Sequence, residues 1–146
     1  MTSFHLRFKQ YGHVTFKVYS RRDAMRRGMA KDWDGWGNLI NTANAACLRG
    51  VDPTGCTIYL HRQALGAGIV THECAHAVIW MLRERGHTRY ATHSNSEETF
   101  CYFIEAMVKD FWNEWYRLNP PPKDTTVRLR KKAKGKELSR DARKVL

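Results

Sequence analysis

One apolar segment with helical periodicity, residues 69–85, constrains the fold of this chain more than any other. Its large apolar side chains recur every three or four positions, and the run ends at Gly86, a pattern typical of an α-helix closed by a glycine. His72, Glu73 and His76 interrupt the apolar pattern. Ionisable side chains in an apolar helix cost stability unless they have partners, so the segment predicts that something binds them.

The interrupting residues form an HExxH motif, Thr71-His72-Glu73-Cys74-Ala75-His76. Residues four apart lie on one face of a helix, so both imidazoles can reach one tetrahedral zinc ion, Zn²⁺. Glu73 would stay off the metal and act as general base on the water that the metal activates. Cys74 lies about 200° around the helix from His72, which predicts that it faces away and packs. The alternative is two hydrogen-bonded core histidines with Glu73 on the surface.

A catalytic zinc site needs a third protein ligand, with the fourth position left to water. Glu97 and Glu98 open the next helical segment, 21 and 22 residues after His76. Helical phase places Glu97 on the buried face and Glu98 with Tyr102. Each glutamate also fits a capping box at the helix start, so one of the two is expected only to cap.

The polar loop before this helix contains competing candidates. His87 and His93 could supply a third, histidine ligand, as in SprT-like proteases. One of them, or Tyr90 or Tyr102, could instead donate a hydrogen bond to the oxyanion of a tetrahedral intermediate. The residues alone leave this choice open.

Residues 71–80 (THECAHAVIW) and 97–105 (EETFCYFIE) resemble small metallopeptidase-like proteins encoded by bacteriophages. Those proteins carry HECxHA followed, after a short loop, by a glutamate with an aromatic residue four positions later. Glu98 with Tyr102 matches that spacing, so the resemblance implies Glu98 as the third ligand of a gluzincin-type site. Residues 56–112 are more distantly similar to ImmA/IrrE-type metallopeptidases, but lack their small-residue run after the glutamate and their helix-ending Met-Pro.

The rest of the chain predicts an α+β domain. Residues 96–118 form a second long helical pattern, stopped by three consecutive prolines. Alternating patterns predict a β-hairpin around residues 10–13 and two strands around a turn at 52–55, and a short basic helix is expected between these pairs, at residues 21–33. We therefore expect a minimal zincin-like domain over residues 1–122, with a small antiparallel sheet packed on two long helices.

Charge is concentrated at the C-terminus. Of the net charge of +11, residues 123–146 contribute +7, from ten Lys or Arg and three Asp or Glu. This basic tail is expected to be flexible, and it could contact nucleic acid through phosphates. It has no aromatic residue for stacking on bases. The alternative is a solvated terminus without a partner.

Cysteine spacing and hydropathy indicate in which cellular compartment the chain is expected. The four cysteines stand singly, which excludes a zinc-finger framework and predicts reduced, mostly buried thiols, although a Cys47–Cys56 disulfide is possible. No run of about 18 apolar residues exists, so no membrane partner is expected. The chain is expected in the cytoplasm, that of the host cell if a phage encodes it.

The functional expectation is a zinc-dependent metallopeptidase that hydrolyses a peptide bond in a protein or peptide substrate. In that case His72, His76 and Glu98 hold the metal and Glu73 is the general base. The alternative is a non-catalytic phage accessory protein with a structural or relict zinc site. Its basic segments would then bind nucleic acid or a host protein.

Overall fold

The computed structural model describes residues 1–33, 43–50, 55–86 and 94–121. The chain divides into two units, Met1–Glu114 and Trp115–Leu146. The first unit contains all the described strands, the helices α1 (Arg22–Asp32) and α3 (Ala67–Glu84), and most of α4 (Ser94–Leu118). Within the described part of the chain, no helix combines the length and the apolar character needed to cross a membrane. The predicted tail, residues 123–146, lies outside the described residues.

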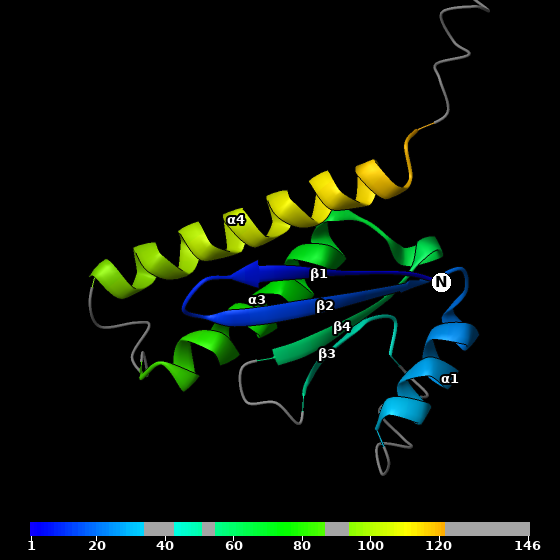
Figure 1. The fold of residues 1–146 in the computed structure, drawn as a ribbon, viewed down its shortest axis with the longest axis horizontal. Coiled ribbons are helices and arrows are strands. Elements are labelled where there is room, and N and C mark those ends of the chain that lie inside the picture. The colour runs from blue at the N-terminus through cyan, green and yellow to red at the C-terminus, as the bar shows by residue number, and fades with distance from the viewer. Residues whose placement is uncertain (34–42, 51–54, 87–93, 122–146) are drawn as a thin grey trace, which may run out of the picture. The chain divides into compact units, whose positions relative to one another are not determined.

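The four described strands form one mixed sheet in the order β1-β2-β4-β3 (Figure 1). Their bounds are Thr2–Phe8 for β1, Gly12–Tyr19 for β2, Ala46–Arg49 for β3 and Gly55–His61 for β4. The pairs β1–β2 and β3–β4 are antiparallel, whereas β2 and β4 are parallel. The prediction of an antiparallel sheet is therefore wrong for its central pair, because alternating patterns identify strands but not their partners or directions.

The predicted N-terminal hairpin is confirmed. Phe4 on β1 lies opposite Phe16 on β2, and their rings stack with centroids 5.2 Å apart. The backbone N–H of Tyr11 closes the turn by donating to the carbonyl of Phe8 at 2.6 Å. Gly12 leaves the turn with φ of 120°, a conformation that glycine adopts without the steric cost of a side chain.

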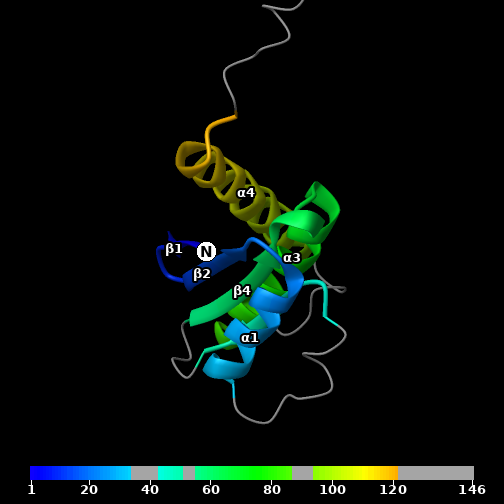
Figure 2. The same cartoon turned by 90° about the vertical axis from the view of Figure 1, so that its right-hand side faces the viewer.

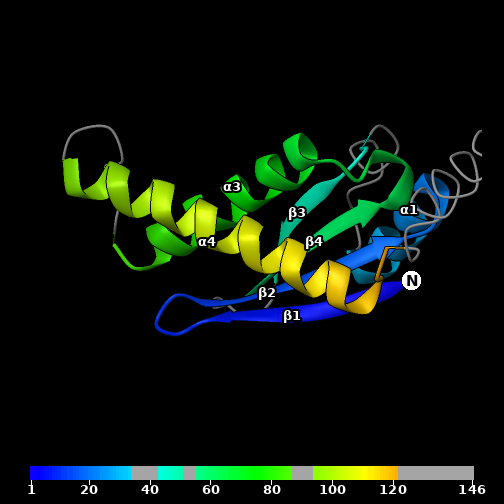
Figure 3. The ribbon, with the colours of Figure 1, turned by 90° about the horizontal axis from the view of Figure 1, so that it is seen from above.

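Helices cover both faces of the sheet (Figure 2). On one face, α1 buries Met25 and Met29 against side chains of β2, β3 and β4, and the cluster consists of Tyr19, Met25, Met29, Leu48 and Tyr59. On the other face, α3 lies beside β3 and β4, and α4 as far as Glu114 lies along β1 and β2 (Figure 3). The helix predicted over residues 21–33 is confirmed as α1.

Helix α3 begins two residues before the predicted apolar segment and ends at Glu84, one residue before the predicted end. The helix ends where the backbone N–H of Arg85 donates to the carbonyl of Leu82 at 3.2 Å. Gly86 follows with φ of +81°, which confirms the predicted C-terminal glycine. Helix α4 begins at Ser94, inside the segment predicted to be a loop, and its 25 residues end at Leu118.

The buried face of α4 differs from the predicted one. The expected face contained Phe100, Cys101, Ile104, Val108, Phe111 and Trp115, yet Cys101 is exposed, and the fully covered side chains are those of Phe103, Met107, Phe111 and Trp115. Contacts with the β1–β2 hairpin determine which side of α4 is buried. Phe103 packs on Phe8 and Tyr11, with ring centroids 5.1 and 4.8 Å away. These contacts with the hairpin determine which side of α4 is buried, and the periodicity of the α4 sequence alone does not indicate them.

The described part of the second unit is the last turn of α4 and the residues that follow it. The backbone N–H of Asn119 donates to the carbonyl of Trp115 at 2.8 Å, and its side-chain amide donates to the same oxygen at 3.2 Å. Both bonds satisfy a carbonyl that the end of a helix would otherwise leave unpaired.

Candidate metal centre

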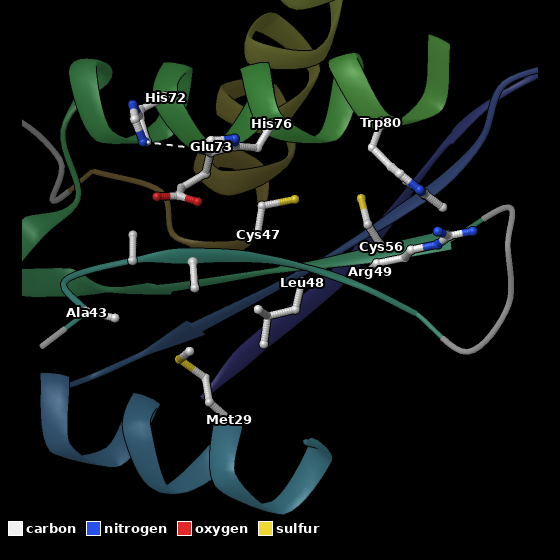
Figure 4. A pocket seen from close by; sticks show the side chains of 12 residues that line it. Met29, Ala43, Cys47, Leu48, Arg49, Cys56, His72, Glu73, His76 and Trp80 are labelled. Atoms are coloured by element: carbon white, nitrogen blue, oxygen red, sulfur yellow. Dashed lines mark hydrogen bonds between the residues drawn. The ribbon is translucent and has the colours of Figure 1, made fainter. Parts of the chain in front are cut away.

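His72 and His76 lie one turn apart on α3 with their imidazoles turned toward each other (Figure 4). Their Nε2 atoms are 3.1 Å apart, and the ring planes are nearly perpendicular, at 84°. Two nitrogens at about 2.0–2.1 Å from one tetrahedral zinc ion lie about 3.3 Å apart. The predicted convergence of the two imidazoles on one face is confirmed, and their spacing fits a shared metal.

Glu73 points from α3 toward β3 (Figure 4) and only 6 % of its surface is exposed. Burial raises the pKa of the Glu73 carboxyl, and the nearby His72 and a hydrogen bond from the backbone N–H of Cys47 offset part of that rise. A surface position for Glu73, the alternative considered from the sequence, is wrong. The carboxylate is held beside the two imidazoles by the main chain of the neighbouring strand.

These three side chains line a cavity of about 530 Å³ between α3 and β3. The lining also includes three small side chains, those of Ala43, Ala45 and Ala46. At the other end, the guanidinium of Arg49 lies 5.2 Å from the centre of the Trp80 ring and pairs with Glu84 at 3.0 Å (Figure 4). The cavity is therefore mainly apolar, with the ionisable groups of the motif at one end.

Cys56 and Cys74 are buried, Cys47 is partly buried and Cys101 is exposed. Cys74 is fully buried outside the cavity lining, as predicted, and burial raises the pKa of its thiol to about 12. Cys47 and Cys56 line the cavity, and a hydrogen bond between their thiols, together with burial, raises the pKa of Cys47 far above its usual range. All four cysteines are free, and Cys101 is exposed on α4.

Within the described ranges, the structure does not bring a third ligand to the two imidazoles. Glu97 and Glu98 are both exposed in the first turns of α4, so the predicted burial of Glu97 is wrong. Among the described residues, no group of three His, Cys, Asp or Glu side chains is arranged to hold a metal. Because Phe103 packs on the hairpin, α4 is oriented so that both glutamates lie on its exposed side. Glu98 as ligand stays a prediction.

The other candidates from the loop divide into two groups. His87, Tyr90 and His93 lie outside the described residues. Tyr102 is described and is 64 % exposed on α4. A role for any of them at the oxyanion stays a prediction.

Sequence patterns missed the β3 side of the site. A strand near residues 43–48 was expected, but nothing in its sequence indicated that its main chain would contact Glu73. The packing of Trp80 on Arg49 was missed for the same reason. Both contacts depend on β3 lying next to β4 under α3, an arrangement that depends on tertiary packing and not on local pattern.

Comparisons with protein-family models, with curated proteins and with solved structures gave no match. The chemistry of the site therefore has to be inferred from its own residues.

Proposed function

We propose that this chain is a zinc-dependent peptidase with a zincin-like α+β domain, related to the phage-encoded proteins that its motif resembles. One observation carries the proposal. Two imidazole Nε2 atoms converge at 3.1 Å beside a buried carboxylate, in a cavity large enough for substrate side chains. Without a ligand, the two exposed histidines gain only the hydrogen bond between their Nε2 atoms, and a buried glutamate costs stability. A shared metal explains both features.

His72 and His76 would hold the ion through Nε2, and Glu98 would complete the set as the motif resemblance implies. Bound Zn²⁺ supplies Lewis acidity, which polarises the scissile carbonyl and makes water acidic enough to be deprotonated near neutral pH. Imidazole nitrogens and a carboxylate are ligands that zinc prefers.

Glu73 would act as the general base. Because burial raises the pKa of its carboxyl, Glu73 is a stronger base than a solvated glutamate. It would accept a proton from the attacking water and return it to the leaving amine. The Cys47 N–H holds the carboxylate in place, so little reorganisation is needed when the proton moves.

The strand that walls the cavity favours a peptide as the substrate. Among the described strands, β3 lies at the edge of the sheet, next to β4 on one side only. An extended peptide can add to such an edge through main-chain hydrogen bonds, with alternate side chains entering pockets. The cavity between β3 and α3 would receive one of these side chains, and its alanine wall suits an apolar one.

The direct test is the Glu73→Gln variant, with Glu105→Gln, an exposed glutamate on α4, as matched control. Bound zinc is measured by elemental analysis, and cleavage by mass spectrometry of an unfolded protein substrate. We expect Glu73→Gln to retain zinc and lose at least about 100-fold in rate, the lower end of what a general base contributes. The control should behave as wild type. Undiminished cleavage by Glu73→Gln would refute this mechanism.

A second candidate is a non-catalytic accessory protein whose zinc site is structural or relict. The observation that favours it is that the described residues assemble two metal ligands and not three. Its basic segments would bind nucleic acid or a host protein. DNA binding that weakens with salt, survives chelation and disappears on deletion of residues 123–146, in a protein without peptidase activity, would support this candidate.

A further inference from the structure

His61 is the last residue of β4 and is 5 % exposed. Among the residues that the structure describes, neither of its ring nitrogens, Nδ1 or Nε2, has a hydrogen-bond partner. Buried polar side-chain atoms are paired in the large majority of cases, because an unpaired one loses its hydration without compensation. A buried imidazole with both nitrogens unpaired therefore requires an explanation.

Two arginines of α1 act on this histidine through their charges. Arg22 and Arg26 are four residues apart, so they share one side of the helix. After burial, the charges of these two side chains are the causes that lower the pKa of His61, and no carboxylate contributes. The Nε atom of Arg26 is itself buried without a partner. Arg22 donates from Nη1 to the Oδ1 of Asn44 at 3.4 Å.

The position of this cluster in the fold is one where ligands bind. Tyr19 and His61 are register partners at the carboxyl ends of the adjacent parallel strands β2 and β4. From β2 the chain continues into α1 on one face of the sheet, and from β4 it continues into α3 on the other. Adjacent parallel strands whose connections leave on opposite faces create a crevice outside their carboxyl ends.

The start of α1 adds to the positive potential. Its N-cap residue, Arg21, makes no side-chain capping hydrogen bond, so the first-turn N–H groups receive none from that side chain. These groups and the helix dipole attract anions. Asp23 in the same turn is an exposed acidic side chain one position from Arg22, about 100° around the helix from it.

We infer that His61, Arg22 and Arg26 form a binding site for a doubly charged oxyanion, namely inorganic phosphate or the phosphate group of a monoester. The arginines would hold the oxyanion through their planar N–H groups. A ring N–H of His61 would donate to a further oxygen. The bound anion would give a partner to that ring nitrogen of His61 and to the Nε atom of Arg26. This site is formed on the α1 face of the sheet, so it does not depend on the proposed peptidase activity.

The test uses the full chain and nuclear magnetic resonance of the His61 ring. Inorganic phosphate is titrated in while chloride keeps the ionic strength constant, and phosphoserine is titrated in a second series. We expect a saturable change in the His61 ring signals. Arg26→Gln should weaken phosphate binding at least about tenfold, as expected for one charge-assisted hydrogen bond. Arg27→Gln, an exposed neighbour with the same charge, should change it less than about twofold.

Binding in either series supports the site, and binding of phosphoserine alone identifies a phosphorylated compound as the source. A lack of saturation in both series overturns the inference. Equal weakening by Arg26→Gln and Arg27→Gln also overturns it, because only net charge would then matter. If Arg26→Gln does not fold, Arg26→Lys replaces it in the test. Lysine keeps the positive charge but lacks the planar N–H groups of the guanidinium, so wild-type phosphate affinity in that variant would contradict the site.

Discussion

The carboxylate of Glu73 on α3 accepts a hydrogen bond from the backbone N–H of Cys47 on β3. This contact joins the HExxH helix to the edge strand and gives the buried carboxylate a partner inside the protein. It also fixes the carboxylate next to the two converging imidazoles, from which the proposed chemistry follows.

Loss of single metal ligands should separate the candidates for the third position. His72→Ala and His76→Ala should each lower zinc affinity more than about 100-fold, the upper end of what loss of a supporting partner costs. We expect Glu98→Gln to do the same, with Glu97→Gln as matched control at wild-type affinity. Competition with a chromogenic chelator measures the zinc affinity of all four variants. Loss of affinity in Glu97→Gln alone would assign the ligand to Glu97.

Gly28 is required by the packing of α1 on the sheet. A β-carbon at this position would overlap the Tyr19 hydroxyl. Gly28→Ala should therefore lower the free energy of unfolding by about 1–3 kcal/mol, as overpacking does. Gly68→Ala on α3, where nothing lies within 4 Å of the added carbon, should leave it unchanged or raise it by up to about 1 kcal/mol. Urea denaturation measures both, and equal effects would contradict the packing argument.

Stability should decrease as the solution is acidified through the range of His61. Burial and the charges of Arg22 and Arg26 lower the pKa of His61 below 6.5 in the folded chain. The unfolded chain then binds the proton first, so stability falls as pH drops from 6.5 toward the folded pKa. His61→Gln should lose this part of the pH dependence in phosphate-free buffer. His5→Gln, at an exposed histidine, should keep it.

Asp32 should stabilise the fold only when ionised. Burial raises the pKa of its carboxyl, but hydrogen bonds from Lys17 at 2.6 Å and from the Tyr59 hydroxyl at 2.5 Å outweigh this and lower it overall. Stability from Asp32 is therefore present above pH 3.8 and lost as pH falls through the folded pKa. Asp32→Asn should be less stable than wild type at pH 7, and this difference should shrink below pH 3.8.

Two variants control for this interpretation. Tyr59→Phe should lower the free energy of unfolding by about 1–2 kcal/mol, since it removes one hydrogen bond to a charged group. Asp23→Asn changes an exposed carboxylate on the same helix and should have little effect. A constant difference between Asp32→Asn and wild type across the acidic range would show that the ionised carboxylate contributes nothing specific.

Local patterns predicted the elements of this fold well. The alternation around Phe4 and Phe16 predicted the hairpin, and the apolar run ending at Gly86 predicted α3. The spacing of His72 and His76 predicted that their imidazoles meet, because helix geometry fixes residues four apart. Each of these predictions depends on residues close together in the chain.

The predictions that were wrong depend on contacts between distant residues. No pattern in β2 or β4 indicates that they pair in parallel, and the face that α4 buries was set by Phe8 and Tyr11 of the hairpin. The contact between Glu73 and the main chain of Cys47 is also long-range. The predicted bond between Glu98 and a metal stays a prediction. It would also join residues far apart in the chain, which is why the sequence alone left Glu97 and Glu98 both open.

The group that anchors Glu73 is a peptide N–H, which every residue except proline possesses. Mutations that exchange the side chain at position 47, or those of the neighbouring alanines in the cavity wall, can therefore reshape the cavity while the anchor persists. Under the proposed function, such changes in the cavity wall would alter which peptide side chains fit, while the position of the Glu73 carboxylate stays the same.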